Sequence, residues 1–85
     1  MAEEKLIGKV THYFGNISVG IIKLSNGGIK IDDEVRFKGG DTDFVQKIVS
    51  MQAEHKDIQE AKKGDEFGTK VDQKVREGYE VYLVS

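Results

Sequence analysis

The 85-residue sequence predicts an all-β fold, and two observations lead to that prediction. Apolar and polar residues alternate with a period of two over several short segments, and ten glycines punctuate the chain. The chain has no proline, which suits strands that use every backbone donor. About six strands at regular spacing indicate a barrel or a sandwich. We expect a closed antiparallel barrel, because closure removes the edges that one short layer would expose.

The first strands follow from the alternation near the N-terminus. Residues 5–14 alternate strictly and predict a strand. A Gly-Asn turn at 15–16 separates it from a second strand over 17–24, which is rich in β-branched residues. Gly20 lies inside this second strand, where we expect a bend or a bulge.

The middle of the chain contains shorter segments. A turn at 25–28 precedes the apolar pair that flanks Lys30, and Asp32-Asp33 makes another turn. A strand over 35–38 ends at Gly39. Residues 43–55 have apolar residues in both phases of the alternation. They predict either a bulge near residues 46–48 or a strand that serves two parts of a sheet.

The remaining segments contain one helix-like patch and two strands. Residues 56–63 are too short for more than a turn or one loose coil. Strands are expected over 67–71 and 79–84, with a turn at 75–78 between them. The whole chain, 1–85, is expected to form one domain, with residues 1–4 disordered.

The stretch Ala61–Gly68, AKKGDEFG, shows the turn chemistry most clearly. Gly64 can adopt positive φ in a tight turn, and the Asp65 carboxylate can bond back to nearby amides. Gly68 lies within a strand pattern, where it indicates a bulge or a close backbone approach. The positions assigned a structural turn role are Gly28, Gly39, Gly64, Asp65, Gly68 and Gly78.

Composition excludes several classes of function. The chain has no cysteine, so disulfides, thiolate zinc sites and thiol nucleophiles are excluded. Its 13 basic and 15 acidic residues are interspersed and give a net charge of −2, without the basic excess of most nucleic-acid binders. No apolar run approaches the roughly 20 residues of a membrane span. No signal peptide is apparent either, and a cytoplasmic location is expected.

Four sequence blocks resemble a known family. They are GIKIDDEVRFKG (28–39), VSMQ (49–52), AKKGDEFG (61–68) and VREGYEVY (75–82). In this order they resemble the second domain of translational GTPases such as elongation factor Tu and initiation factor 2. The resemblance covers about residues 6–84 and implies a small closed six-stranded antiparallel Greek-key barrel of the translation-protein type.

The chain departs from that family's pattern at several places. Asp32 stands where the family usually has glycine, and Tyr79 stands where aspartate is usual. Glu66 occupies the position of an asparagine near the aminoacyl pocket of elongation factor Tu. The chain has no GxxxxGK[ST] loop, so no nucleotide hydrolysis is expected. Similar barrels also occur at the C-terminus of some U32-type peptidase-like proteins, and the fold does not fix the role.

Basic residues are the best candidates for a binding surface. Arg36 and Lys38 project from one face of their strand, and Lys30 precedes them. Lys47 would complete a positive stripe if the next strand pairs antiparallel. Tyr13 and Phe14 beside the 15–16 turn would add a stacking surface. The alternative is an ordinary solvated barrel face, with Tyr13 and Phe14 covering the end of the barrel.

The sequence gives no sign of a catalytic or metal site. His12 has no acidic or histidine neighbour at ligand spacing, and His55 reads as part of a polar strand end. The glycine pairs at 27–28 and 39–40 are not followed by a helix, so they do not predict a phosphate site. We therefore expect no enzyme activity, cofactor, metal or nucleotide.

The expected function is a non-enzymatic binding module of the translation-factor barrel type. Its expected partners are RNA, the ribosome or a translation-associated protein. The near-neutral, mixed charge favours an alternative: a protein-interaction adaptor or accessory subunit of a separately encoded enzyme, for example a U32 peptidase-like protein.

Overall fold

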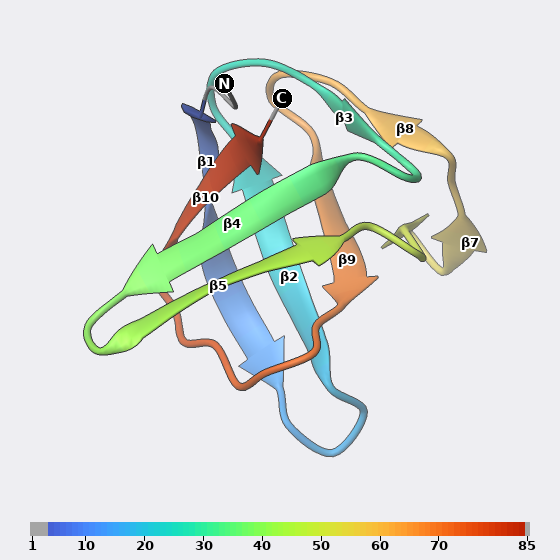
Figure 1. The fold of residues 1–85 in the computed structure, drawn as a ribbon. Helices are drawn as coiled ribbons and strands as arrows, with labels where there is room; N and C mark the ends of the chain where they lie inside the picture. The colour runs from blue at the N-terminus through green and yellow to red at the C-terminus, as the bar shows by residue number, and fades with distance from the viewer. Residues whose placement is uncertain (1–3, 85) are drawn as a thin grey trace.

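The computed structural model describes residues 4–84 (Figure 1). The disorder expected at the N-terminus therefore lies outside the described residues for 1–3, whereas Glu4 begins the first strand. Within residues 4–84 the regular elements are all strands. They are β1 (Glu4–Phe14), β2 (Val19–Leu24), β3 (Ile29–Lys30), β4 (Glu34–Gly39), β5 (Thr42–Lys47), β6 (Gln52–Ala53), β7 (Lys56–Asp57), β8 (Glu60–Ala61), β9 (Glu66–Lys70) and β10 (Glu80–Val84).

The strands form one large antiparallel sheet and one small one. The large sheet has the order β5-β4-β10-β1-β2-β9-β6-β7, and β3 pairs with β8 in the small sheet. In Figure 1, β4 and β5 cross in front of β2 and β9, so the large sheet folds over on itself. Its order also requires this curl, because only residues 48–51 connect β5 at one end to β6 near the other.

These pairings confirm the all-β prediction and its antiparallel character. Among the described residues, six strands have five or more residues, as the alternation predicted. Backbone ladders alone do not close a barrel, because within residues 4–84 the large sheet ends at β5 on one side and at β7 on the other.

Side-chain hydrogen bonds connect the β5 end of the curled sheet, and the link that follows it, to β9 near the other end. Gln46 of β5 is only 5% exposed. Its Nε2 donates to the Lys70 carbonyl at 2.8 Å, and its Oε1 accepts from the Asp72 amide at 2.7 Å. Nearby, Thr69 Oγ1 donates to the Ser50 carbonyl at 2.7 Å. A buried amide with both ends bonded is stable where an unpaired one would not be.

One cluster of buried apolar side chains fills the space inside the curl. Phe37 and Phe44 stack in it with ring centroids 5.1 Å apart. Its members come from both layers of the sheet and from the connecting segments. They are Ile7, Val10, Ile22, Leu24, Ile29, Val35, Phe37, Phe44, Ile48, Met51, Ala61, Phe67, Val71, Val75 and Val81.

Strand β1 shows why strict alternation misjudged one face. The ladder to β10 shifts register between Leu6 and Gly8, and the ladder to β2 shifts between Val10 and His12. Each bulge inserts one residue and reverses the phase that follows it. Ile7 and Val10, predicted on opposite faces, are therefore both buried.

Two further predictions about the middle of the chain need correction. The irregularity expected at Gly20 lies instead in β1, while Gly20 keeps regular pairing and is buried under Val71 and Val75. Residues 43–55 form two strands of one sheet, β5 and β6, which is the second alternative given by their mixed phases. Residues 56–63 include β7 and β8 and form no helical coil.

The Gly64 turn has the geometry that its sequence suggested. Gly64 has φ of 93°, and the Asp65 amide donates to the Lys62 carbonyl at 2.9 Å. The Asp65 carboxylate accepts from the Lys62 amide, also at 2.9 Å. The Asp65 side chain thus adds a second hydrogen bond across the turn, as aspartate does in turns of this kind.

A second turn repeats this arrangement with aspartate in place of glycine. Asp32 has φ of 79°, the Asp33 amide donates to the Lys30 carbonyl at 3.1 Å, and the Asp33 carboxylate accepts from the Lys30 amide at 3.0 Å. The turn survives the substitution because aspartate tolerates the left-handed region better than most residues. Gly78 has the same φ of 93° in the turn before β10.

The other predicted turn glycines allow close packing instead. A Cβ on Gly39 would lie 2.3 Å from the Tyr79 ring, and one on Gly28 would lie 2.8 Å from the Ala61 carbonyl oxygen. Gly68 underlies Val19 and Ile21. The positive φ expected near Gly28 and Gly39 belongs to their neighbours, Gly27 at 115° and Gly40 at 55°.

The Gln46 connection predicts a large effect of one polar substitution. Gln46→Ala leaves the Lys70 carbonyl and the Asp72 amide without their buried partner, and we expect a loss of about 3 kcal/mol in the free energy of unfolding. Urea denaturation measures it. Gln59→Ala, at an exposed position, is the control and should change stability by less than about 0.5 kcal/mol. Equal denaturation midpoints for Gln46→Ala and wild type would contradict the assigned role.

The two matched turns predict effects of opposite sign. Asp32→Gly removes a side chain from a positive-φ position and should stabilise the protein by up to about 1 kcal/mol. Gly64→Asp should destabilise it by a similar amount, and Gly64→Val by more, since a β-branched residue fits this region worst. Thermal melting of the three variants gives the order, and a Gly64→Val protein as stable as wild type would refute this reading of the turn.

Candidate functional site

Arg36, the centre of the predicted basic stripe, is held by carboxylates on both sides. Its Nη1 contacts Glu4 Oε2 of β1. Its Nε lies 3.2 Å from Asp43 Oδ1 of β5, a contact that is electrostatic rather than a hydrogen bond. Arg36 projects away from Val35 and Phe37, which are fully buried, so the predicted face is correct.

The neighbouring lysines also lie opposite acidic residues. Lys38 of β4 is directly across from Asp43 on one side and Glu80 on the other. Lys47 is directly across from Glu34. Directly opposite residues of an antiparallel pair project to the same face, so positive and negative charges alternate there. The antiparallel pairing expected for Lys47 occurs, but the surface that it makes is mixed in sign.

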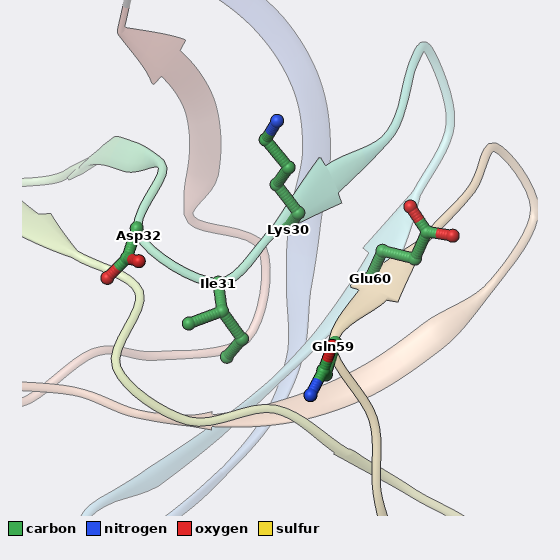
Figure 2. Close-up of a pocket in the computed structure, with 5 residues that line it drawn as sticks. All are labelled: Lys30, Ile31, Asp32, Gln59 and Glu60. Atoms are coloured by element: carbon green, nitrogen blue, oxygen red, sulfur yellow. The ribbon is translucent and has the colours of Figure 1, made fainter.

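Lys30, the fourth basic candidate, lies on the small sheet rather than beside Arg36. It is directly across from Glu60 and lines a shallow pocket with Ile31, Asp32 and Gln59. Figure 2 shows Lys30 and Asp32 on either side of Ile31, with the Glu60 carboxylate on the neighbouring segment. This pocket holds charges of both signs around one aliphatic side chain, and nothing in it selects an anion.

Tyr13 does not offer an exposed stacking surface. It is half-buried and packs against the core, and its ladder partner is Gly20 of β2. For Tyr13 this corresponds to the alternative, in which the ring covers the interior, whereas Phe14 of the same prediction is 47% exposed. The five predicted binding residues are therefore not brought together as a positive stripe, and the described structure gives no support to RNA or ribosome binding.

An apolar surface lies instead at the end of the β1–β2 hairpin. Phe14 is 47% exposed and Ile17 is 57% exposed. Val19 and Ile21 of β2 lean over Gly68 of β9, where an added Cβ would lie 3.2 Å and 3.1 Å from their methyl groups. We call these four side chains, Phe14, Ile17, Val19 and Ile21, the tip patch. Gln52, Glu54, His55 and Gly68 complete its lining.

Backbone strain gathers around the tip patch. Of the non-glycine residues with positive φ in the described chain, Ser18 (56°), Glu54 (53°) and His55 (66°) are at this end. Glu54 and His55 form the two-residue turn between β6 and β7, in which glycine and asparagine are the preferred residues. Such strain often marks functional sites, since the surrounding structure has to maintain it.

An acidic groove adjoins the tip patch and shares Glu54 with it. Its lining includes the four carboxylate residues Glu54, Glu60, Asp65 and Glu66, and no lysine or arginine. Apolar atoms of Ala53 and Ile58 form the rest, beside Gly64. Within residues 4–84, no group of three histidine, cysteine, aspartate or glutamate residues is arranged to hold a metal ion.

The two histidines lie at the tip patch and not in a catalytic arrangement. His12 stacks on Phe14 with ring centroids 6.4 Å apart, and His55 is in the strained turn. The hydroxyls with hydrogen bonds among the described residues, such as Thr11 to Glu66 at 2.9 Å, bond to carboxylates, backbone groups or another hydroxyl and not to either imidazole.

The tip patch could have been suspected from one feature of the sequence. In the strand 17–24 both phases are apolar: Ile22 and Leu24 are buried, and Ile17, Val19 and Ile21 lie on the other face. A strand that is apolar on both faces covers more than the core of its own domain. The contribution of Glu54 and His55 had no local signal, because it depends on how β6 pairs with β9.

In sequence, the chain is similar to proteins named as a protease or a collagenase, although no family model matches it. An uncharacterized protease of Methanocaldococcus jannaschii is 42% identical over 79 residues, which are 92% of this chain and 19% of that protein. A collagenase of Porphyromonas gingivalis is 27% identical over 94% of this chain and 22% of that protein. The chain thus spans about a fifth of the length of these relatives.

Solved structures show the same fold. The C-terminal domain of a putative U32 peptidase from Geobacillus thermoleovorans matches with a TM-score of 0.85 and 20% identity, covering 93% of this chain and 91% of that one. Its selenomethionine variant matches with a TM-score of 0.84, also at 20% identity, covering 91% of this chain and 96% of that one. Within residues 4–84, no helix is long and apolar enough to cross a membrane.

These findings correct the identification drawn from the sequence blocks. The structural neighbours are domains of a U32 peptidase and the relatives are named as proteases, so the assignment to translation-factor barrels was wrong. The physical reason is visible in the turns. Asp32-Asp33 and Gly64-Asp65, which lie in two of the four blocks, make the same backbone turn twice, so these pairs report turn geometry rather than ancestry or function. The chain has the same fold as the C-terminal domain of that U32 peptidase.

Tyr82, directly across from Arg36, has an altered titration because of its surroundings. Partial burial of Tyr82 raises its pKa above the usual value of 10.0, and the Glu80 carboxylate, which accepts its hydroxyl hydrogen bond at 3.2 Å, raises that pKa further. Because the folded state favours the protonated phenol, this contribution to stability is present below pH 10.0 and lost as pH rises above it.

Glu80→Gln should therefore lower the Tyr82 pKa toward 10.0 and reduce that loss of stability at high pH. Ultraviolet titration of the phenolate measures it, with Tyr82→Phe identifying the signal among the three tyrosines. An unchanged titration in Glu80→Gln would show that the carboxylate does not act on Tyr82.

Proposed function

We propose that the chain is a non-catalytic, protein-binding accessory domain or subunit of a U32 peptidase-like protein. One observation supports this most strongly: the match to the Methanocaldococcus jannaschii protease is 42% identical over 92% of this chain but only 19% of that protein. A segment that small in a much larger protease, with the fold of a U32 C-terminal domain, fits an appended module that works beside a catalytic part.

The arrangement of polar side chains supports a role in binding rather than catalysis. Catalytic nucleophiles need a base within hydrogen-bond reach and a third group that orients the base. His12 packs on Phe14 and His55 is in an exposed turn, while the charged residues around Arg36 neutralise one another across strands. Several large apolar side chains are exposed, which favours contact with another protein.

The contact with a peptidase part is best placed at the end where the chain termini meet. Glu4 is paired with Val84, and Figure 1 shows both ends of the described chain close together. On the outer face there, Leu6 is 36% exposed and Val45 is 43% exposed, and half-buried Tyr82 is directly opposite Arg36. We call this set, Leu6, Arg36, Val45, Tyr82 and Val84, the terminal face. Any polypeptide joined to either end would lie beside it.

We also propose that the curled sheet behaves as a closed Greek-key barrel of six main strands. The support is the connection between its ends. Gln46 bonds from β5 to the end of β9, and the short link 48–51 leads directly to β6. A rigid closed body would hold the terminal face and the tip patch at fixed positions, as an accessory domain requires.

Binding to the relative's remaining part tests the proposed function. We expect this chain to form a one-to-one complex with the Methanocaldococcus jannaschii protease that lacks its matching 79 residues, measured by calorimetry and sedimentation. Leu6→Asp combined with Tyr82→Ala should weaken the complex at least about tenfold, since central apolar and aromatic contacts dominate interfaces.

Val49→Ser is the matched control, because Val49 is also exposed but lies outside the terminal face. A chimera in which this chain replaces the matching segment covers the case of an unstable truncated relative. In the chimera, amides of the terminal face should exchange more slowly than in the isolated chain. If no complex forms and exchange at the terminal face is the same in both, the proposed function is wrong.

A further inference from the structure

We propose that the tip patch and the adjoining acidic groove bind a second polypeptide, in a segment that has a bulky apolar side chain flanked by lysine or arginine. This inference rests on the proposed role as a protein-binding domain and adds a second surface to it. The tip patch supplies the apolar half of the site and the groove supplies the charged half. The two share Glu54, so they form one continuous surface.

The apolar half is a shallow platform built from two strands and a loop. Val19 and Ile21 lie against Gly68, whose missing side chain lets them pack flat over β9. Phe14 and Ile17 extend the platform toward the hairpin end, and both are about half exposed or more. A partner's apolar side chain would cover them, and burying exposed apolar area is the main source of affinity at such contacts.

The charged half favours a cationic partner. The residues that line the groove include four carboxylates and no basic side chain. Two of these carboxylates have a lysine across the ladder, Lys30 opposite Glu60 and Lys23 opposite Glu66, which reduces the negative charge there; among the described residues, Glu54 and Asp65 have no lysine opposite them in a ladder. Lysine or arginine beside the apolar anchor would therefore meet charge of the opposite sign.

The same charge argues against the other occupants. Nucleic acids and anionic bilayers carry negative charge, and the groove would repel them. A second copy that used this surface in a symmetric dimer would bring no lysine or arginine to the acidic groove, because neither half of the surface is lined by one in the described chain. A basic, apolar polypeptide segment is the partner that both halves of the surface fit.

The site is already formed in the free protein. The Glu54–His55 turn has positive φ at both positions, and Ser18 has positive φ while its carbonyl accepts the Val71 amide at 2.9 Å. These constraints fix the backbone of the Glu54–His55 turn and of the loop that carries Ile17 relative to β9. A preformed site loses less conformational entropy on binding than one that must be ordered first.

The tip patch is far from the terminal face. Strand β1 leads from Glu4, beside the termini, to Phe14 at the tip patch, about 30 Å away at ~3.3 Å per residue. The longest dimension of the molecule is 35 Å. A peptidase part on the terminal face would leave the tip patch accessible, so one domain could hold two proteins at once.

Peptide titration of the whole chain tests this proposal. The probes are short synthetic peptides: one with phenylalanine flanked by lysines, one with the lysines replaced by glutamates, and one with the phenylalanine replaced by serine. We expect amide chemical shifts at Ile17, Ile21, Gly68 and Glu54 to move with the first peptide alone, and the affinity to fall as salt increases. Phe14→Ser with Ile17→Ser, and separately Glu54→Lys, should each lower that affinity at least about tenfold.

Val49→Ser, an exposed apolar position outside this surface, should bind the first peptide as wild type does. The proposal is overturned if the glutamate peptide binds as tightly, or if shifts occur elsewhere or nowhere. It is also overturned if the same residues respond to protein concentration alone, or to anionic lipid vesicles in preference to the peptide. Peptide binding does not depend on the terminal face, so Leu6→Asp with Tyr82→Ala should leave it unchanged. This variant separates failure here from failure of the proposed function.

Discussion

The buried side chain of Gln46 connects β5, at one end of the curled sheet, to β9 near the other end, and the position of both candidate surfaces depends on that connection. Its amide group bonds to the Lys70 carbonyl and the Asp72 amide, just beyond the reach of any backbone ladder from β5. Beside it, the Thr69 hydroxyl donates to the Ser50 carbonyl and fixes the link that leads into β6. With β6 held against β9, the Glu54–His55 turn lies beside Gly68, and the tip patch meets the acidic groove there.

The strands were largely predictable from the sequence because each is short, alternates and ends at a turn residue. The face predicted for Arg36 was correct, since Val35 and Phe37 carry the burial of that strand. The phase of β1 was not predictable, because its two bulges are set by pairing with β10 and β2 rather than by local residues. In segment 43–55 the apolar residues of the two halves follow opposite phases of the alternation, and the sequence shows this conflict. Only the sheet order shows that the two halves belong to opposite ends of one sheet.

The candidate site was less predictable than the fold, and electrostatics explains why. A list of basic residues does not show what lies across the ladder, and in this sheet Lys38 and Lys47 lie opposite Asp43 and Glu34. The sequence blocks were misleading for a related reason. Two of them contain an Asp-Asp or Gly-Asp pair that closes a turn through the aspartate carboxylate, a solution that unrelated chains can reach independently. The relatives are named as proteases and the structural neighbours are C-terminal domains of a U32 peptidase, and in this fold the terminal face and the tip patch lie at opposite ends of β1.

The connection made by Gln46 can be observed directly at Asp72, whose amide donates a hydrogen bond to Gln46 Oε1 at 2.7 Å. Asp72 lies beyond the end of β9, so no strand ladder within residues 4–84 protects this amide. Amide hydrogen exchange by NMR is the most direct measurement, because protection reports a bonded and inaccessible N–H. We expect the Asp72 amide to exchange as slowly as the ladder amide of Ile22 in β2. Exchange of Asp72 at the rate of an unprotected loop amide would mean that the sheet is open at this end, and the two surfaces would lose their fixed geometry.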